Sequence, residues 1–151
     1  AMSAYQRAVE ANPKDARALN GLAVSHDLKQ QHKAAQDLYE KAYESADSKL
    51  QNGILVNWGL SLMLSGEAGQ AVQKLEPAVN ETDLPSLRQV LAIAYGLSGQ
   101  KDKAKQLGLT NPPTYDDLRA SIREYGMAGP TGSGPQAAPV GEVVTVPPKS
   151  R

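Results

Sequence analysis

Three segments of the chain repeat one spacing of small residues, and this repeat limits the possible folds more than any other feature. The small residues recur at intervals of 36 and 33, in two sets: Ala23, Gly59 and Ala92, then Ala35, Ala71 and Ala104. The apolar residues around them follow the period of an α-helix. A small residue lets a second helix approach closely, but one such hairpin cannot bury its apolar face alone. The sequence therefore predicts an all-α solenoid of stacked helical hairpins.

The repeat sets the expected boundaries within a helical domain at 1–125. A partial repeat at 1–13 is followed by repeats at about 16–48, 52–84 and 85–111 and by a helix at 114–125. Turns are expected at Gly66 and Gly99, where glycine leaves a helix easily, and Gln30 replaces glycine in the first copy. Thr114 and Asp117 have the spacing of a capping box. We expect the helix at 114–125 to cap the exposed end of the solenoid.

Composition changes after the helical domain. Residues 126–151 hold five Gly and five Pro in 26 positions, which is typical of a flexible linker and tail. The tail also carries a β-branched cluster: Val140, Val143, Val144 and Val146. One interpretation is a disordered tail with a chance apolar patch. The other is a segment that docks in extended form on the helical domain, in cis or from a neighbouring chain.

The hairpin pattern is similar to the tetratricopeptide repeat, a unit of about 34 residues. Three stretches narrow the resemblance to the TadD-type lipoproteins of the bacterial tight-adherence (Flp/Tad) pilus system: "ALNGLAV", "NWGLSLMLSG" and "LRQVLAIAYGLSG". The resemblance covers about residues 1–125. It implies a pilotin-like protein at the periplasmic face of the outer membrane, which binds a secretin subunit. Members carry a lipidated cysteine, so a chain without Cys would be the soluble part of such a lipoprotein.

The first helix of each hairpin is expected to line the concave face of the solenoid. Positions that do not pack within a hairpin form the predicted groove: Asn20, Val24, Asp27, Leu28, Val56, Leu60, Met63, Leu64, Gln89, Ile93 and Leu97. The segment from Ile54 to Leu64 is apolar nearly all round, although a surface helix should have a polar face. Either neighbouring repeats bury this second apolar face, or it accepts a peptide or helix from a partner. Asn20 and Gln89 could then hydrogen-bond the ligand backbone.

Charge and cysteine content exclude several classes of function. The 16 Lys and Arg residues balance 16 Asp and Glu residues, which argues against the basic surface of a nucleic-acid-binding protein. With no Cys, the chain has no disulfide, thiolate metal site or cysteine nucleophile. The apolar run at 54–64 is shorter than the roughly 20 residues that span a bilayer.

No residue pattern predicts catalysis, a metal site or a cofactor. His26 stands at a hairpin-packing position and is expected to be a partly buried, hydrogen-bonded histidine. His32 lies in a polar turn and is expected to be solvated. Asp116 and Asp117 are interpreted as acidic residues at a helix start. We therefore expect a protein-binding scaffold rather than an enzyme. The alternatives are a self-associating structural module, including a homodimer, and a cytoplasmic secretion chaperone.

Overall fold

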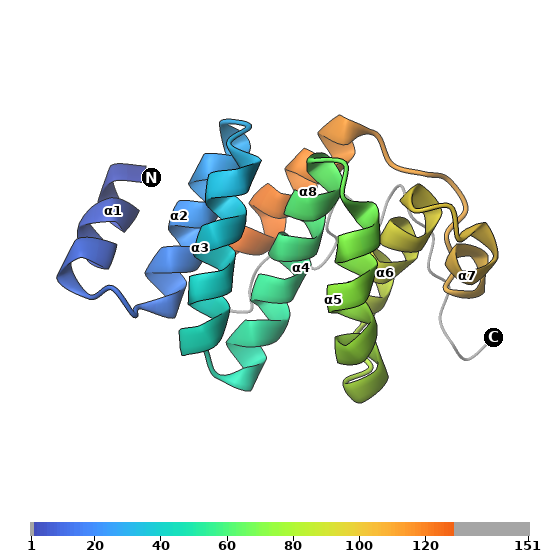
Figure 1. Cartoon of the computed structure of the whole chain (residues 1–151), viewed down its shortest axis with the longest axis horizontal. Coiled ribbons are helices and arrows are strands. Elements are labelled where there is room, and N and C mark those ends of the chain that lie inside the picture. The colour runs from blue at the N-terminus through green and yellow to red at the C-terminus, as the bar shows by residue number, and fades with distance from the viewer. Residues whose placement is uncertain (1, 129–151) are drawn as a thin grey trace.

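The computed structural model describes residues 2–128, which form eight α-helices (Figure 1). In chain order these are α1 (Met2–Ala11), α2 (Ala16–Leu28), α3 (His32–Ser45), α4 (Ser48–Leu64), α5 (Ala68–Glu81), α6 (Pro85–Leu97), α7 (Lys101–Gln106) and α8 (Tyr115–Ala128). The described part of the chain contains no strand, so the predicted all-α class is confirmed. Residues Val140 to Val146 of the predicted docking tail lie outside the described residues.

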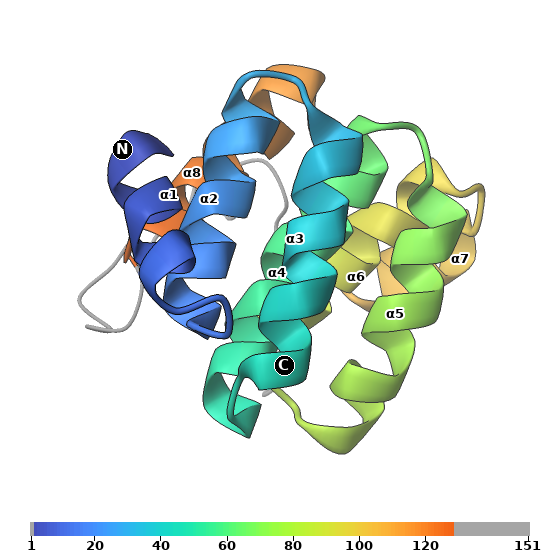
Figure 2. The ribbon, with the colours of Figure 1, turned by 60° about the vertical axis from the view of Figure 1, so that its left-hand side comes forward.

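Helices that follow one another along the chain also pack against one another, from α1·α2 through to α6·α7. The helices α2, α4 and α6 form one layer, and α3 and α5 form a second layer beside it (Figures 1 and 2). Contacts between α4 and α6 hold the first layer together. We call the face of α2, α4 and α6 that is turned away from α3 and α5 the inner face. It is the face that the sequence predicted to be concave.

Local signals place several helix ends. The side chains of Asp15 and Asp47 accept hydrogen bonds from the amides of Ala18 (3.1 Å) and Leu50 (2.9 Å), so they cap α2 and α4. The predicted turns are confirmed, because Gly66 and Gly99 have φ values of 82° and 90°. Gln30 takes the same left-handed conformation with φ 62°, which glycine adopts without steric cost and glutamine does not.

Helix α4 forms the centre of the core. All eleven residues from 54 to 64 are buried, as expected for a helix without a polar face. Gly59 makes the predicted close approach to α5, because a Cβ atom there would lie 2.9 Å from Cδ1 of Leu75. Helix α4 begins at Ser48, at the end of the first predicted repeat rather than at residue 52. The side-chain cap from Asp47 explains this earlier start.

The predicted location of α8 is wrong. It does not stack on the last hairpin as an end cap but packs against α4 and α2, on the inner face. Figures 1 and 2 both show α8, in orange, on the opposite side of α2 and α4 from α3 and α5. Helix α7 is only six residues long, and Gly108 follows it with φ 98°, so the chain turns away after it. The segment at 107–114 then leads back to the inner face.

The expected start of α8 is confirmed in detail. The amide of Thr114 donates to Oδ2 of Asp117 (3.0 Å), and the amide of Asp117 donates to Oγ1 of Thr114 (3.1 Å). This reciprocal pair is a capping box with aspartate in the acidic position. The local sequence therefore predicted where α8 begins but not what it packs against.

Candidate functional site

The inner face is the candidate functional site, and most of its apolar side chains are buried. Six apolar members of the predicted groove are at most 8% exposed: Val24, Val56, Leu60, Met63, Leu64 and Ile93. Leu28 and Gln89 are half-buried. Leu97, at the end of α6, is 43% exposed. The predicted groove is therefore a covered surface with one open end rather than an empty channel.

Helix α8 provides the cover over α2 and α4. Leu118 and Ile122 lie four residues apart on one side of α8 and are 4% and 0% exposed. Both belong to the same apolar core as Val24, Val56 and Leu60. Ser121 stands between them at 0% exposed, and its hydroxyl donates to the carbonyl of Asp117 within α8 (2.9 Å). Leu118, Ser121 and Ile122 therefore need no hydrogen bond from the inner face.

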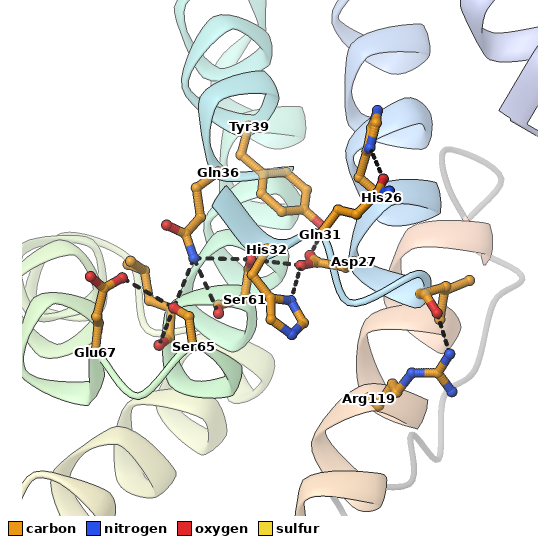
Figure 3. A network of polar contacts seen from close by, with 12 residues as sticks. His26, Asp27, Gln31, His32, Gln36, Tyr39, Ser61, Ser65, Glu67 and Arg119 are labelled. Atoms are coloured by element: carbon orange, nitrogen blue, oxygen red, sulfur yellow. Dashed lines mark hydrogen bonds and ion pairs between the residues drawn. The ribbon is translucent and has the colours of Figure 1, made fainter. Parts of the chain in front are cut away.

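Two polar contacts hold α8 at the edge of the inner face. Arg119 donates from Nη2 to the carbonyl of Leu28, the last residue of α2. This carbonyl has no partner within its own helix, so Arg119 serves as a cap for α2. The hydroxyl of Tyr115 lies 3.0 Å from Nε2 of His32. Figure 3 shows Arg119 reaching from α8 to the end of α2.

The structure corrects the role of Asp27, which does not line an open groove. Its carboxyl group is fully buried and receives three hydrogen bonds, from Tyr39 (2.8 Å), Ser61 (2.8 Å) and His32 (2.7 Å). Asp27 thus joins α2, α3 and α4 at a single point (Figure 3). Burial raises the pKa of Asp27 above its usual value, although the three hydrogen bonds oppose the shift. Burial and the neighbouring Asp27 raise the pKa of Tyr39 well above 10.

The polar network extends from Asp27 along α4. The side-chain amide of Gln36 donates to the carbonyl of Ser61 (3.3 Å) and to Oγ of Ser65 (3.0 Å). Ser65 in turn donates to Oε1 of Glu67 (3.0 Å). These contacts tie α3 to the end of α4 and to the turn after it. None of these residues was predicted from the sequence to be a polar partner.

Asn20 also differs from the prediction. It is 8% exposed, and its Oδ1 accepts a hydrogen bond from Nδ2 of Asn57 (3.2 Å). The side chain therefore links α2 to α4 and is not available to hydrogen-bond a ligand backbone. Oδ1 of Asn57 is buried without a hydrogen-bond partner among the described residues, which costs free energy in a closed core.

The two histidines behave differently. His26 is half-buried and its Nδ1 lies 2.6 Å from Oε1 of Gln31, so its expected role as a satisfied histidine is confirmed. The expectation of a solvated His32 is wrong, because its side chain is only 11% exposed and bonds Asp27 and Tyr115. The predicted polar turn brings His32 over the end of α2, where its Nδ1 hydrogen-bonds to Oδ1 of Asp27 (2.7 Å).

Asp27, His32 and Ser61 are the residue types of a catalytic triad, but their order differs. In a triad the histidine stands between the serine and the aspartate and takes the serine proton. Here Ser61 donates directly to Asp27, and Nε2 of His32 faces Tyr115. The arrangement therefore orients and satisfies buried groups and does not activate Ser61.

Pockets also lie outside the covered part of the inner face. One, of about 470 Å³, lies between α3 and α5 and includes Trp58 and Lys74, whose Nζ stands 4.0 Å from the centre of the indole ring. Another, of about 270 Å³, lies at the open end of the helix array and is lined mainly by α7 and the segment after it, including Ala104, Leu109 and Pro112. The end pocket occupies the region where α8 was expected to pack.

Among the described side chains, those of residues 2–122, no group of three or more acidic or histidine residues could hold a metal ion. None of the described helices has the length and hydropathy needed to cross a bilayer. Comparison of the chain with protein-family models, with curated proteins and with solved structures found no match.

Proposed function

We propose that this protein is a non-catalytic binding protein of the tetratricopeptide type, which holds a helical segment of another protein on its inner face. One observation carries the proposal: the inner face already holds an amphipathic helix, α8, through Leu118 and Ile122. A surface that packs one amphipathic helix has the shape and apolar character that a second one requires.

The repeat architecture is supported by the turns. Gln30, Gly66 and Gly99 all have left-handed backbone conformations, and they follow one another at intervals of 36 and 33 residues. The small residues of the hairpins show the same intervals. A non-glycine residue in this conformation at the equivalent position indicates that the turn geometry is common to the three helix pairs.

The sequence resemblance to TadD-type lipoproteins suggests the partner and the location. A pilotin-like protein would bind a segment of a secretin subunit at the periplasmic face of the outer membrane. The predominantly apolar inner face fits an amphipathic segment better than an acidic or nucleic-acid ligand. The proposal therefore names a secretin segment of a tight-adherence pilus system as the partner.

The test is a binding titration with the C-terminal segment of such a secretin. Leu97→Asp places a charge on the exposed end of the inner face, and we expect at least about a tenfold loss of affinity, worth about 1.4 kcal/mol. Asn80→Asp adds the same charge to an exposed position of α5 and should bind normally. Equal binding by both variants, or no binding by the unsubstituted chain, would reject the proposal.

A second candidate function is supported by the end pocket. Its apolar lining at Leu109 and Pro112 is not covered by α8, which packs elsewhere. In a repeat protein an uncapped end can stack on another copy. Light scattering over a hundredfold range of concentration tests such self-association, and a constant monomer mass would exclude it.

A further inference from the structure

Helix α8 has the properties of a bound ligand. The segment at 107–114 connects it to α7, and among the described helices it packs mainly against α4 and α2 rather than α7. We propose that α8 is an intramolecular competitor for the inner face, and that the partner is an amphipathic helix that displaces it. This inference rests on the proposed function, because it concerns the same surface.

The buried side of α8 defines the chemistry of the partner. Up to residue 122, where its side chains are described, it presents two branched apolar residues, Leu118 and Ile122, four positions apart, with the small residue Ser121 beside them. Four positions place the two apolar side chains on one side of a helix. A small residue between them lets the helix backbone approach the surface closely. The partner helix should therefore carry the pattern of two large apolar residues at i and i+4 with a small residue at i+3.

Asp27 and Asn20 impose no further requirement on the partner. Asp27 is saturated by Tyr39, Ser61 and His32, and Asn20 bonds Asn57. These groups are used within the array, so a replacement helix does not have to satisfy them. Recognition then depends on shape and apolar contact, which many amphipathic helices can offer.

The edge contacts of α8 can be exchanged for equivalent ones. The carbonyl of Leu28 needs one donor, and a lysine or arginine directly after the first apolar residue of a partner would supply it as Arg119 does. Arg119 itself is imperfectly satisfied, because its Nε is buried without a hydrogen-bond partner among the described residues. Tyr115, on the other edge contact, is 41% exposed. Replacing these contacts of α8 with those of a partner therefore costs little free energy.

The open end of the inner face offers a partner an accessible apolar surface for its first contact. Leu97 is 43% exposed while the equivalent surface on α4 is buried. The segment at 107–114 acts as a tether that keeps α8 at a high local concentration near the inner face, roughly millimolar for a short flexible connection. A partner that competes with α8 therefore has a lower apparent affinity than it would have for an open surface. The affinity is reduced in proportion to the fraction of chains in which α8 has left the inner face.

The experiment uses α8 itself as the probe. A fluorescein-labelled peptide of residues 114–128 is titrated with the full unsubstituted chain and with the full chain carrying Leu118→Asp, which drives α8 off the core. Fluorescence anisotropy should show at least about tenfold tighter binding to Leu118→Asp. The control Asn111→Asp adds a carboxylate at an exposed position of the tether and should behave like the unsubstituted chain. A peptide with Asp at both 118 and 122 should not bind.

Equal affinity of the peptide for the unsubstituted and Leu118→Asp chains, or binding to neither, overturns the inference. If circular dichroism shows that Leu118→Asp has lost its helices, Arg119→Ala decides instead. This variant weakens only the edge contact and should bind the peptide at least about threefold more tightly than the unsubstituted chain; unchanged affinity then rejects the inference.

The secretin titration separates this inference from the proposed function. A secretin segment that binds the unsubstituted and Leu118→Asp chains equally supports the proposed function and overturns the competition. A chain that binds the α8 peptide only when opened, but never the secretin segment, supports competition for the inner face and rejects the secretin as partner.

Discussion

The hydroxyl of Ser61 donates to Oδ1 of Asp27 over 2.8 Å, and both side chains are fully buried. This contact crosses from α4 to α2, between residues 34 positions apart in the chain. Because burial raises the pKa of Asp27, each donor that reaches its carboxylate offsets part of the desolvation cost. The contact is therefore a structural link whose removal has a measurable cost.

Replacing Ser61 with alanine should lower the free energy of unfolding by about 1–3 kcal/mol, because it leaves a buried acceptor with one donor fewer. Urea unfolding followed by circular dichroism measures the change. Ser121→Ala is the matched control, since Ser121 is equally buried but donates only to a carbonyl of its own helix. We expect this control to lose less than about 1 kcal/mol. Equal losses in the two variants would contradict the assigned role of Asp27.

Two glycines of α4 should respond in opposite ways to alanine. A Cβ at Gly59 would stand 2.9 Å from Cδ1 of the fully buried Leu75, so Gly59→Ala should destabilise the chain by about 1–3 kcal/mol. A Cβ at Gly53 meets no atom within 4 Å, so Gly53→Ala should stabilise it by about 0.5–1 kcal/mol through helix propensity. Thermal unfolding of both variants tests the pair. Stabilisation by Gly59→Ala would show that α4 and α5 do not approach closely there.

The attachment of α8 should depend far more on the buried side chain of Ile122 than on the contact of Tyr115 with His32. Ile122→Ala removes a fully buried side chain, and we expect a loss of about 2–5 kcal/mol in the free energy of unfolding. Tyr115→Phe removes only the contact with His32 at an exposed position, which should cost less than about 1 kcal/mol. Denaturant titration distinguishes these outcomes. A negligible effect of Ile122→Ala would place α8 off the inner face in solution.

Tyr95 predicts a pH dependence in the alkaline range. Burial and a 2.5 Å hydrogen bond to Oε2 of Glu76 raise its pKa to about 12, from 10.0 for an ordinary tyrosine. The unfolded chain therefore loses this proton at lower pH than the folded chain, so stability falls as pH rises from about 10 to about 12. Tyr95→Phe cannot ionise, and its stability should fall less over that interval.

The measurement is urea unfolding at several pH values from 9 to about 12, with the two chains compared at each pH. Tyr39 remains in both chains, and its raised pKa affects both equally, so the difference isolates Tyr95. Parallel stability curves for the two chains would exclude the shift.

The helical hairpins could be predicted from the sequence because close helix packing has a local requirement. A small residue must stand at Ala23 or Gly59 for the next helix to approach, and the turn must tolerate the conformation seen at Gly66. The start of α8 could be predicted for the same reason, since Thr114 and Asp117 form their capping box within one turn.

The location of α8 could not be predicted, because the stripe formed by Leu118 and Ile122 fits any apolar surface of suitable shape. Both the end of the array and the inner face offer one. The apolar character of α4 on all sides did indicate that something covers it, but not what. The role of Asp27 could not be predicted either, because its three hydrogen-bond donors lie 5, 12 and 34 residues away in the chain. No pattern in the sequence pairs them.

The contact between Arg119 and the carbonyl of Leu28 joins residues 91 positions apart. An array of helices in which each contacts only its neighbours can unfold from either end, one unit at a time. Here α8, the last described helix, contacts α2, so residues far apart in the chain hold the array together. Freeing either α2 or α4 also frees α8, which favours unfolding of the array as one cooperative unit and makes folding slower than in an open array of local contacts.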